Sequence, residues 1–233
     1  MTPALRGALL VVIAVGIFAV MDTIAKYLAR SYPVPGIMWV RYMANLLILL
    51  AFLAARGELK RVRTARPGLQ MLRGLLLAGA GFLYFTSLTV LPIAEAAAIG
   101  FVMPLFLALL AVPMLGERMD SARMTAVLIG LAGALVIVRP GASVFTPYAL
   151  LPVGMAVCNA LYQILTRKVA GIEHPFTSVV WGAIVGAVLF SFALPFAWVT
   201  PTDPWHWALL GMGIIVASGI YLVGHQRLAM RRG

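Results

Sequence analysis

The stretch PIAEAAAIGFVMPLFLALLAVPM, residues 92–114, is almost entirely apolar, and Glu95 is its single charged side chain. About twenty residues of α-helix span the hydrocarbon core of a bilayer, and a helix satisfies its own backbone hydrogen bonds there. This stretch therefore predicts a transmembrane helix.

Similar apolar runs recur along the chain, which has 63% hydrophobic and 11% charged residues and a mean hydropathy of +1.01. We expect an all-α polytopic membrane protein with about eight spans, because each run is long enough to cross a bilayer. No segment is long and polar enough to form a soluble domain. The expected spans are residues 4–29, 35–55, 68–89, 92–114, 122–138, 148–167, 177–199 and 206–226.

The net charge of +11 is concentrated in connections between spans. One basic cluster lies within residues 56–66, between the second and third spans, and another within residues 227–232. Basic loops are retained on the cytoplasmic side, so we expect both termini inside. Contact with membrane lipid explains this charge, and we expect no nucleic-acid partner.

Two segments of the chain are similar to each other. Residues 18–30 read FAVMDTIAKYLAR and residues 155–167 read MAVCNALYQILTR. Their intramembrane polar positions coincide, pairing Asp22 with Asn159 and Lys26 with Gln163. The helices that follow match at a proline and a tryptophan, pairing Pro33 with Pro175 and Trp39 with Trp181. Five spans separate the two starts, so the second copy is inverted, as in many secondary transporters.

The chain resembles the drug/metabolite transporter superfamily, and within it the EamA-type transporters. The resemblance is carried by GIFAVMDTIAK (16–26), PGIMWVRY (35–42) and LTVLPIAEAAAIGFVMPLFLALLAVPMLGER (88–118). Among the branches it is most similar to bacterial S-adenosylmethionine uptake transporters. This implies a secondary transporter in the bacterial inner membrane that moves a small amino-acid-like or S-adenosylmethionine-like metabolite by alternating access.

Members of this family usually have ten helices in two inverted halves of five. We expect residues 1–140 to form a first repeat of five helices and residues 146–233 an incomplete second repeat of three. The last span resembles the family's final helix, which indicates that about two helices are missing before it. The alternative is a transport-inactive or scaffold-type remnant of such a transporter. A homodimer is one way in which the missing helices would be replaced.

Charged and polar side chains at membrane depth are the candidates for solute binding, because burying them in hydrocarbon is costly. The sequence contains no motif for hydrolysis, nucleotide binding or metal binding, so we expect no enzyme activity, no cofactor and no metal. The candidate substrate-binding residues are Asp22, Lys26, Trp39, Arg41, Tyr84, Glu95, Asn159, Gln163 and Trp181.

Each charged candidate has two interpretations. Asp22 either lines a cavity or pairs with Lys26 one turn away, although Lys26 can also snorkel to the interface. Arg41 either pairs with Asp22 or snorkels to lipid headgroups, and Arg73 is expected to snorkel. Glu95 either stabilises the positive end of a helix dipole or attracts cations.

The neutral candidates also have two interpretations. Trp39 and Trp181 are interfacial anchors or solute ligands. Asn159 and Gln163 form hydrogen bonds between helices or to the solute. Pro104, in the middle of the fourth span, breaks the hydrogen-bond ladder of the helix there and either acts as a hinge or belongs to a closely packed helix that does not move.

Overall fold

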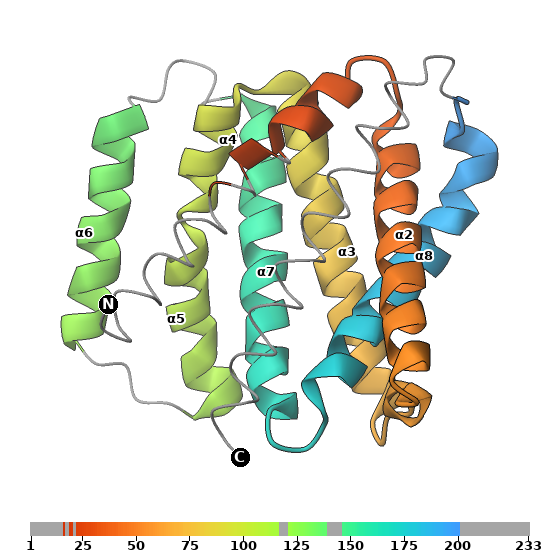
Figure 1. Cartoon of the computed structure of the whole chain (residues 1–233). Coiled ribbons are helices and arrows are strands. Elements are labelled where there is room, and N and C mark those ends of the chain that lie inside the picture. Colours follow the sequence, from red (N-terminus) through yellow and green to blue (C-terminus); the bar gives the residue numbers. More distant parts are fainter. Residues whose placement is uncertain (1–15, 17–18, 21, 117–120, 139–145, 201–233) are drawn as a thin grey trace, which may run out of the picture.

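The computed structural model describes residue 16 and residues 19–20, 22–116, 121–138 and 146–200. Residues 22–28 are helical. The long helices that follow cross the molecule roughly side by side (Figure 1), linked by the 3₁₀ turns η1 (Leu59–Val62) and η3 (Pro147–Ala149). These helices are α2 (Val34–Ala55), α3 (Pro67–Val90), α4 (Ile93–Gly100), α5 (Met103–Leu115), α6 (Ser121–Val138), α7 (Leu150–Val169) and α8 (Pro175–Ala197).

The expected fold class is confirmed, and the chain is an all-α polytopic membrane protein. Five helical stretches in the described part of the chain are long and apolar enough to cross a membrane, and Met124–Gly133 within α6 is a shorter apolar helix. The bounds of α2, α3, α6, α7 and α8 lie within a few residues of the expected spans. The expected span at 206–226 lies outside the described residues.

The fourth expected span is interrupted next to Pro104, the residue at which the sequence suggested a break in the helix. The span is broken into α4, which ends at Gly100, and α5, which begins at Met103, so Pro104 lies in the first turn of α5. Proline has no N–H to donate and its ring collides with the carbonyl four residues earlier. The helix therefore breaks just before Pro104 and does not continue through it.

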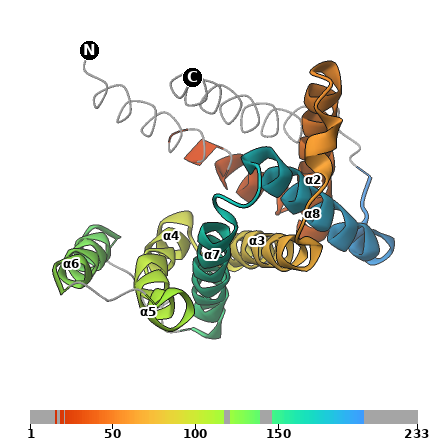
Figure 2. The ribbon, with the colours of Figure 1, turned by 90° about the horizontal axis from the view of Figure 1, so that it is seen from below.

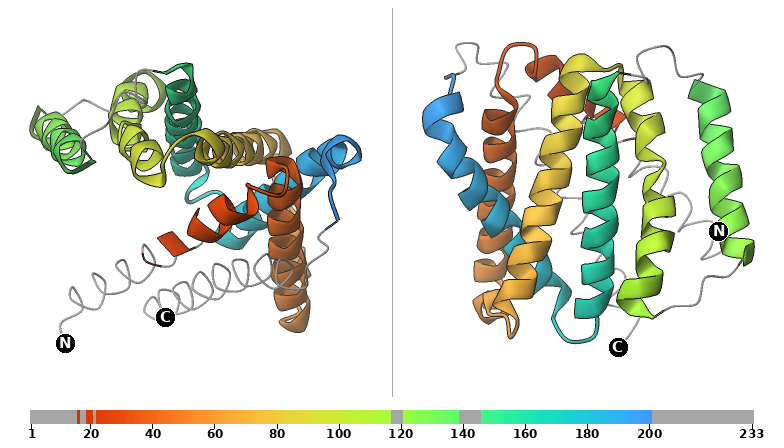
Figure 3. Two further views of the ribbon diagram at one scale, coloured as in Figure 1. Left: turned by 90° about the horizontal axis from the view of Figure 1, so that it is seen from above. Right: turned by 180° about the vertical axis from the view of Figure 1, so that it is seen from behind.

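The helices form two groups when viewed along the bundle. Helices α3, α7, α5 and α6 follow one another in a row, while α2 and α8 cross beside the α3 end of that row (Figures 2 and 3). Helix α3 packs against both α7 and α8, α2 packs against α8, and α5 packs against α7. The largest buried cluster includes Met38 and Tyr42 of α2, Phe85 of α3 and Phe190 of α8.

Glycines and prolines set the helix ends. Gly57, Gly116 and Gly171 follow α2, α5 and α7 with φ values of 67°, 66° and 85°, a conformation that favours glycine because it lacks a Cβ. Pro67 and Pro175 occupy the first position of α3 and α8, where no N–H is needed. The loop of residues 56–66 and the turn between α7 and α8 lie together at the bottom of Figure 1, which we call the basic-loop end.

Candidate solute-binding site

A carboxylate–phenol pair joins the first helical segment to α3. The Tyr84 hydroxyl donates a hydrogen bond to Asp22 Oδ2 at 3.0 Å. Both side chains are half-buried. The carboxylate therefore has a neutral donor as its partner within the membrane-spanning part of the protein.

The neighbouring aromatic residue of α3 holds a cation. The Arg41 guanidinium, on α2, lies over the Phe85 ring with its Cζ 5.3 Å from the ring centroid, a geometry in which the ring face attracts the positive charge. The rings of Tyr84 and Phe85 meet edge to face, 5.8 Å apart. The expected Asp22–Arg41 ion pair is not formed in this structure, because each side chain has a different aromatic partner.

Lys26 has a partner at the end of α3. Its Nζ donates to the carbonyl oxygen of Leu91 at 2.7 Å. The last carbonyls of a helix have no partner within it, so an ammonium group is well placed there. The Asp22–Lys26 pair is therefore not formed in this structure, and Lys26 reaches the end of α3 instead.

The two tryptophan candidates both link α8 to α2 or to the loop that follows α2. Trp39 Nε1 donates to Ser191 Oγ of α8 at 2.8 Å, and its ring meets Trp198 edge to face at 5.7 Å. Trp181 Nε1, on α8, donates to the Val62 carbonyl at 2.9 Å. The two contacts lie at opposite ends of the bundle, and in both the indole reaches beyond its own helix.

The amide candidates lie on α7 and face α5. Gln163 Nε2 lies 3.2 Å from Met103 Sδ and 3.4 Å from Asn159 Oδ1. Gln163 thus contacts a second helix through Met103, whereas its contact with Asn159 lies within α7. Glu95 is half-buried in the first turn of α4, the position at which it was expected to stabilise the helix dipole.

Seven of the nine candidates fall into three groups. Asp22 and Arg41 contact the aromatic pair formed by Tyr84 and Phe85 of α3. Asn159 and Gln163 lie on α7, where Gln163 faces α5, and the tryptophans lie at contacts of α8. Lys26, whose Nζ lies at the end of α3, and Glu95, in the first turn of α4, lie outside these groups. Among the described residues, no group of His, Cys, Asp or Glu side chains is arranged to hold a metal ion.

Sequence reasoning missed a buried polar cluster between α3 and α7. Arg73 is 3% exposed, and its guanidinium donates to Gln70 Oε1 at 2.7 Å, Thr166 Oγ1 at 3.1 Å and Tyr162 Oη at 3.3 Å. The expectation that Arg73 snorkels to the interface is wrong, because the side chain turns toward α7. The pairing of Gln70 and Arg73 three residues apart on one helix face was the available signal.

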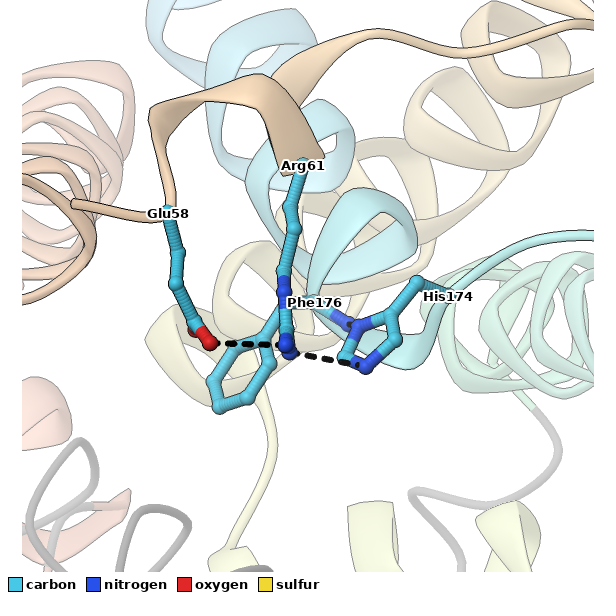
Figure 4. Close-up of polar contacts among 4 residues, drawn as sticks. All are labelled: Glu58, Arg61, His174 and Phe176. Carbon is cyan, nitrogen blue, oxygen red and sulfur yellow. Dashed lines mark hydrogen bonds and ion pairs between the residues drawn. The ribbon is translucent and has the colours of Figure 1, made fainter. Parts of the chain in front are cut away.

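A second missed set of contacts holds the basic loop. Arg61 forms an ion pair with Glu58 at 2.7 Å, and its Nη1 lies 2.8 Å from His174 Nε2 (Figure 4). The His174 ring stacks on Phe176 with centroids 5.6 Å apart. Glu173 accepts hydrogen bonds from the Thr64 hydroxyl at 2.6 Å and the Ala65 N–H at 2.8 Å. The loop is therefore attached to the turn between α7 and α8.

The fold is shared with a solved structure. A crystal structure whose title gives only "protein" superimposes with a TM-score of 0.64 at 24% identity, over 89% of this chain and 76% of that one. This likeness concerns the fold alone.

Curated relatives are bacterial transporters. An S-adenosylmethionine uptake transporter of Rickettsia bellii is 30% identical over 78% of this chain and 62% of its own length. A riboflavin transporter of Vibrio cholerae is 30% identical over 91% of this chain and 73% of its own. A pseudopaline exporter of Pseudomonas aeruginosa is 29% identical over 91% and 75%. The chain thus spans less than two thirds of the Rickettsia bellii transporter.

The EamA-like transporter family model matches residues 5–139, more than half of the chain. The multi-pass helical fold and the bacterial transporters that resemble this chain agree with that match. The chain belongs to the EamA-like transporter family.

Proposed function

We propose that this chain is a secondary transporter, and not an enzyme, that moves a small amino-acid-like solute across the bacterial inner membrane by alternating access. S-adenosylmethionine is the first candidate solute, because the Rickettsia bellii relative is described as taking it up. A family of transporters and a multi-pass helical bundle support this class of function.

One observation carries the choice of solute class. Asp22 and Arg41 have opposite charges, lie on neighbouring helices, and are held by Tyr84 and Phe85 without forming an ion pair with each other. Unpaired charges at membrane depth are costly and mark substrate pathways. A solute that carries both an ammonium group and a carboxylate offers each of these side chains a counter-charge at contact distance, which the two do not give each other in this structure.

The remaining parts of the proposal concern the surrounding helices. We place Asn159, Gln163 and Glu95 along the path of the solute, and Lys26, Trp39 and Trp181 at its ends. We assign residues 1–140 to a first repeat, a range close to the match of the family model, and residues 146–233 to an incomplete inverted repeat. The basic loop supports an orientation with both termini inside.

Uptake of labelled S-adenosylmethionine by proteoliposomes that contain the full chain tests this proposal. We expect saturable uptake that Asp22→Asn lowers by about tenfold or more, since an interaction with a charged group contributes roughly 1.5–3 kcal/mol. Thr23→Ala is the matched control, because Thr23 is exposed beside Asp22 and its hydroxyl bonds to Ala19 of its own helix. Equal rates in wild type and Asp22→Asn would remove Asp22 from the site.

A second candidate function is a transport-inactive or scaffold-type remnant of such a transporter; the match covers 62% of the Rickettsia bellii transporter. This candidate predicts no uptake of S-adenosylmethionine, amino acids or riboflavin by the chain as it stands. It also predicts that adding two family-like helices restores uptake. A homodimer that is active without added helices would instead support compensation by a second copy, which cross-linking in the proteoliposomes would detect.

A further inference from the structure

The buried polar cluster between α3 and α7 lies toward the basic-loop end of the bundle. We call it the Arg73 cluster and define it as Gln70, Arg73, Tyr162, Thr166 and Ser178. Both polar atoms of the Gln70 amide form hydrogen bonds: its oxygen accepts from Arg73, and its nitrogen donates to Ser178 Oγ at 3.1 Å. The cluster therefore connects α3 to both α7 and α8.

The partners of Arg73 are all neutral. Three side-chain oxygens accept its hydrogen bonds, and its Cζ lies 5.0 Å from the centroid of the Tyr162 ring. The Thr166 hydroxyl donates to the Tyr162 carbonyl at 2.7 Å, which leaves its lone pairs to accept from Arg73. No carboxylate compensates the charge of Arg73 in the described part of the chain.

A buried cation with neutral acceptors makes a contact that water can replace. Inside the protein the three side-chain acceptors take the place of the water that the guanidinium loses on burial. When α3 and α7 separate, water replaces the lost acceptors and solvates the charge fully. An apolar contact lacks this compensation, because its separation exposes hydrocarbon to water. The Arg73 cluster thus holds the helices together through hydrogen bonds that water can replace when the helices separate.

Further contacts tie the same end together. Glu173, in the turn between α7 and α8, holds the backbone of Ala65 and the hydroxyl of Thr64. The Thr177 hydroxyl donates to the Arg61 carbonyl at 2.6 Å. These contacts join residues of the proposed first repeat to residues of the proposed second one, as the Arg73 cluster does.

We infer that the Arg73 cluster is the closed gate at the basic-loop end, and that breaking the Arg73 contacts to Tyr162 and Thr166 opens the solute path to that side. This inference rests on the proposed transport function. Arg73 acts as a positioning residue in it, since its hydrogen bonds to Tyr162 and Thr166 hold two helices in one state.

Hydrogen–deuterium exchange of the full chain in lipid nanodiscs, without solute, tests the gate. In alternating access one end of the transporter closes when the other opens. Breaking the gate should therefore speed hydrogen–deuterium exchange at the basic-loop end and slow it at the opposite end. In Arg73→Gln we expect about tenfold faster exchange in residues 66–76 and 160–172, the scale of losing a hydrogen bond to a charged group. We expect slower exchange at the opposite end, in residues 32–40 and 86–92.

Two further variants keep the test independent of folding. Tyr162→Phe and Thr166→Val each remove one acceptor from Arg73, and we expect the same reciprocal pattern with a smaller amplitude. Arg56→Gln is the matched control, because this arginine is exposed and lies over Phe52 at 4.4 Å, away from the cluster. It should leave both ends unchanged.

Three outcomes would contradict the gate inference: faster exchange at the basic-loop end alone, faster exchange at both ends, or no change in exchange. Each would mean that the Arg73 cluster only packs the helices together. The exchange measurement needs no solute, so its result does not depend on the result of the uptake experiment. Reciprocal exchange without uptake of S-adenosylmethionine would support the gate and reject the proposed solute. Uptake without reciprocal exchange would support the transporter and reject this gate.

Discussion

Tyr84 holds Asp22 while Lys26, one turn from Asp22 on the same helix, bonds to the Leu91 carbonyl instead. The carboxylate and the ammonium of one helical segment thus contact two different positions on and just after α3. The Lys26 ammonium group thus interacts with a helix end, and Tyr84 is the hydrogen-bond partner of the Asp22 carboxyl group.

The first prediction concerns Tyr84. Its hydroxyl orients Asp22, so Tyr84→Phe should raise KM for the solute about three- to tenfold, the value of a single hydrogen bond. In the Asp22→Asn background the same change should have little additional effect, because the two residues act as one unit. Uptake kinetics in proteoliposomes measure both. Additive effects of the two substitutions would show that Tyr84 and Asp22 act separately.

The second prediction concerns Arg41. If its guanidinium binds the carboxylate of the solute, Arg41→Gln should lower uptake of an amino-acid-like solute about tenfold or more. Uptake of the corresponding amide, which lacks that charge, should be unaffected by the same substitution. Competition assays with the acid and amide forms of one solute measure this difference. An equal loss for both forms would indicate that Arg41 supports the helix packing around Phe85 instead.

The positions of the helices could be predicted from the sequence, because bilayer thickness determines the length of a transmembrane span. The expected span 35–55 corresponds to Val34–Ala55, and 68–89 corresponds to Pro67–Val90. The equal spacing from Pro33 to Trp39 and from Pro175 to Trp181 suggested equivalent positions. In the structure both indoles form hydrogen bonds outside their own helices, at opposite ends of the bundle, and the repeat itself stays a prediction.

The hydrogen-bond partners of the polar side chains could not be predicted from the sequence. Depth along α3 suggested that Arg73 reaches the interface, but the rotation of α3 about its own axis decides whether Arg73 faces lipid or α7. That rotation is set by packing against α7 and α8, which no single span encodes. Lys26 illustrates the same limit, because its partner is a backbone carbonyl 65 residues away.

The third prediction compares two glycines on α8. A Cβ at Gly186 would collide with the Tyr42 ring, whereas a Cβ at Gly182 would lie 3.5 Å from Leu77 Cδ2, an ordinary contact. Gly186→Ala should therefore destabilise the protein by about 1–3 kcal/mol. Gly182→Ala should be neutral or stabilise it by up to about 1 kcal/mol, the gain in helix propensity. Thermal unfolding in detergent distinguishes them, and similar Tm shifts would contradict the close α2–α8 packing.

The fourth prediction concerns the attachment of the basic loop. Glu173 accepts from both Thr64 and Ala65, so Glu173→Ala should free the loop. Cleavage by trypsin after the basic residues of 56–66 should become about tenfold faster in detergent, since proteolysis follows the population of the open form and hydrogen bonds to a charged group contribute roughly 1.5–3 kcal/mol. Lys168→Ala, at an exposed position near the same end of α7, should leave the rate unchanged. Equal rates in wild type and Glu173→Ala would mean that Arg61, Thr177 and Trp181 are enough to hold the loop.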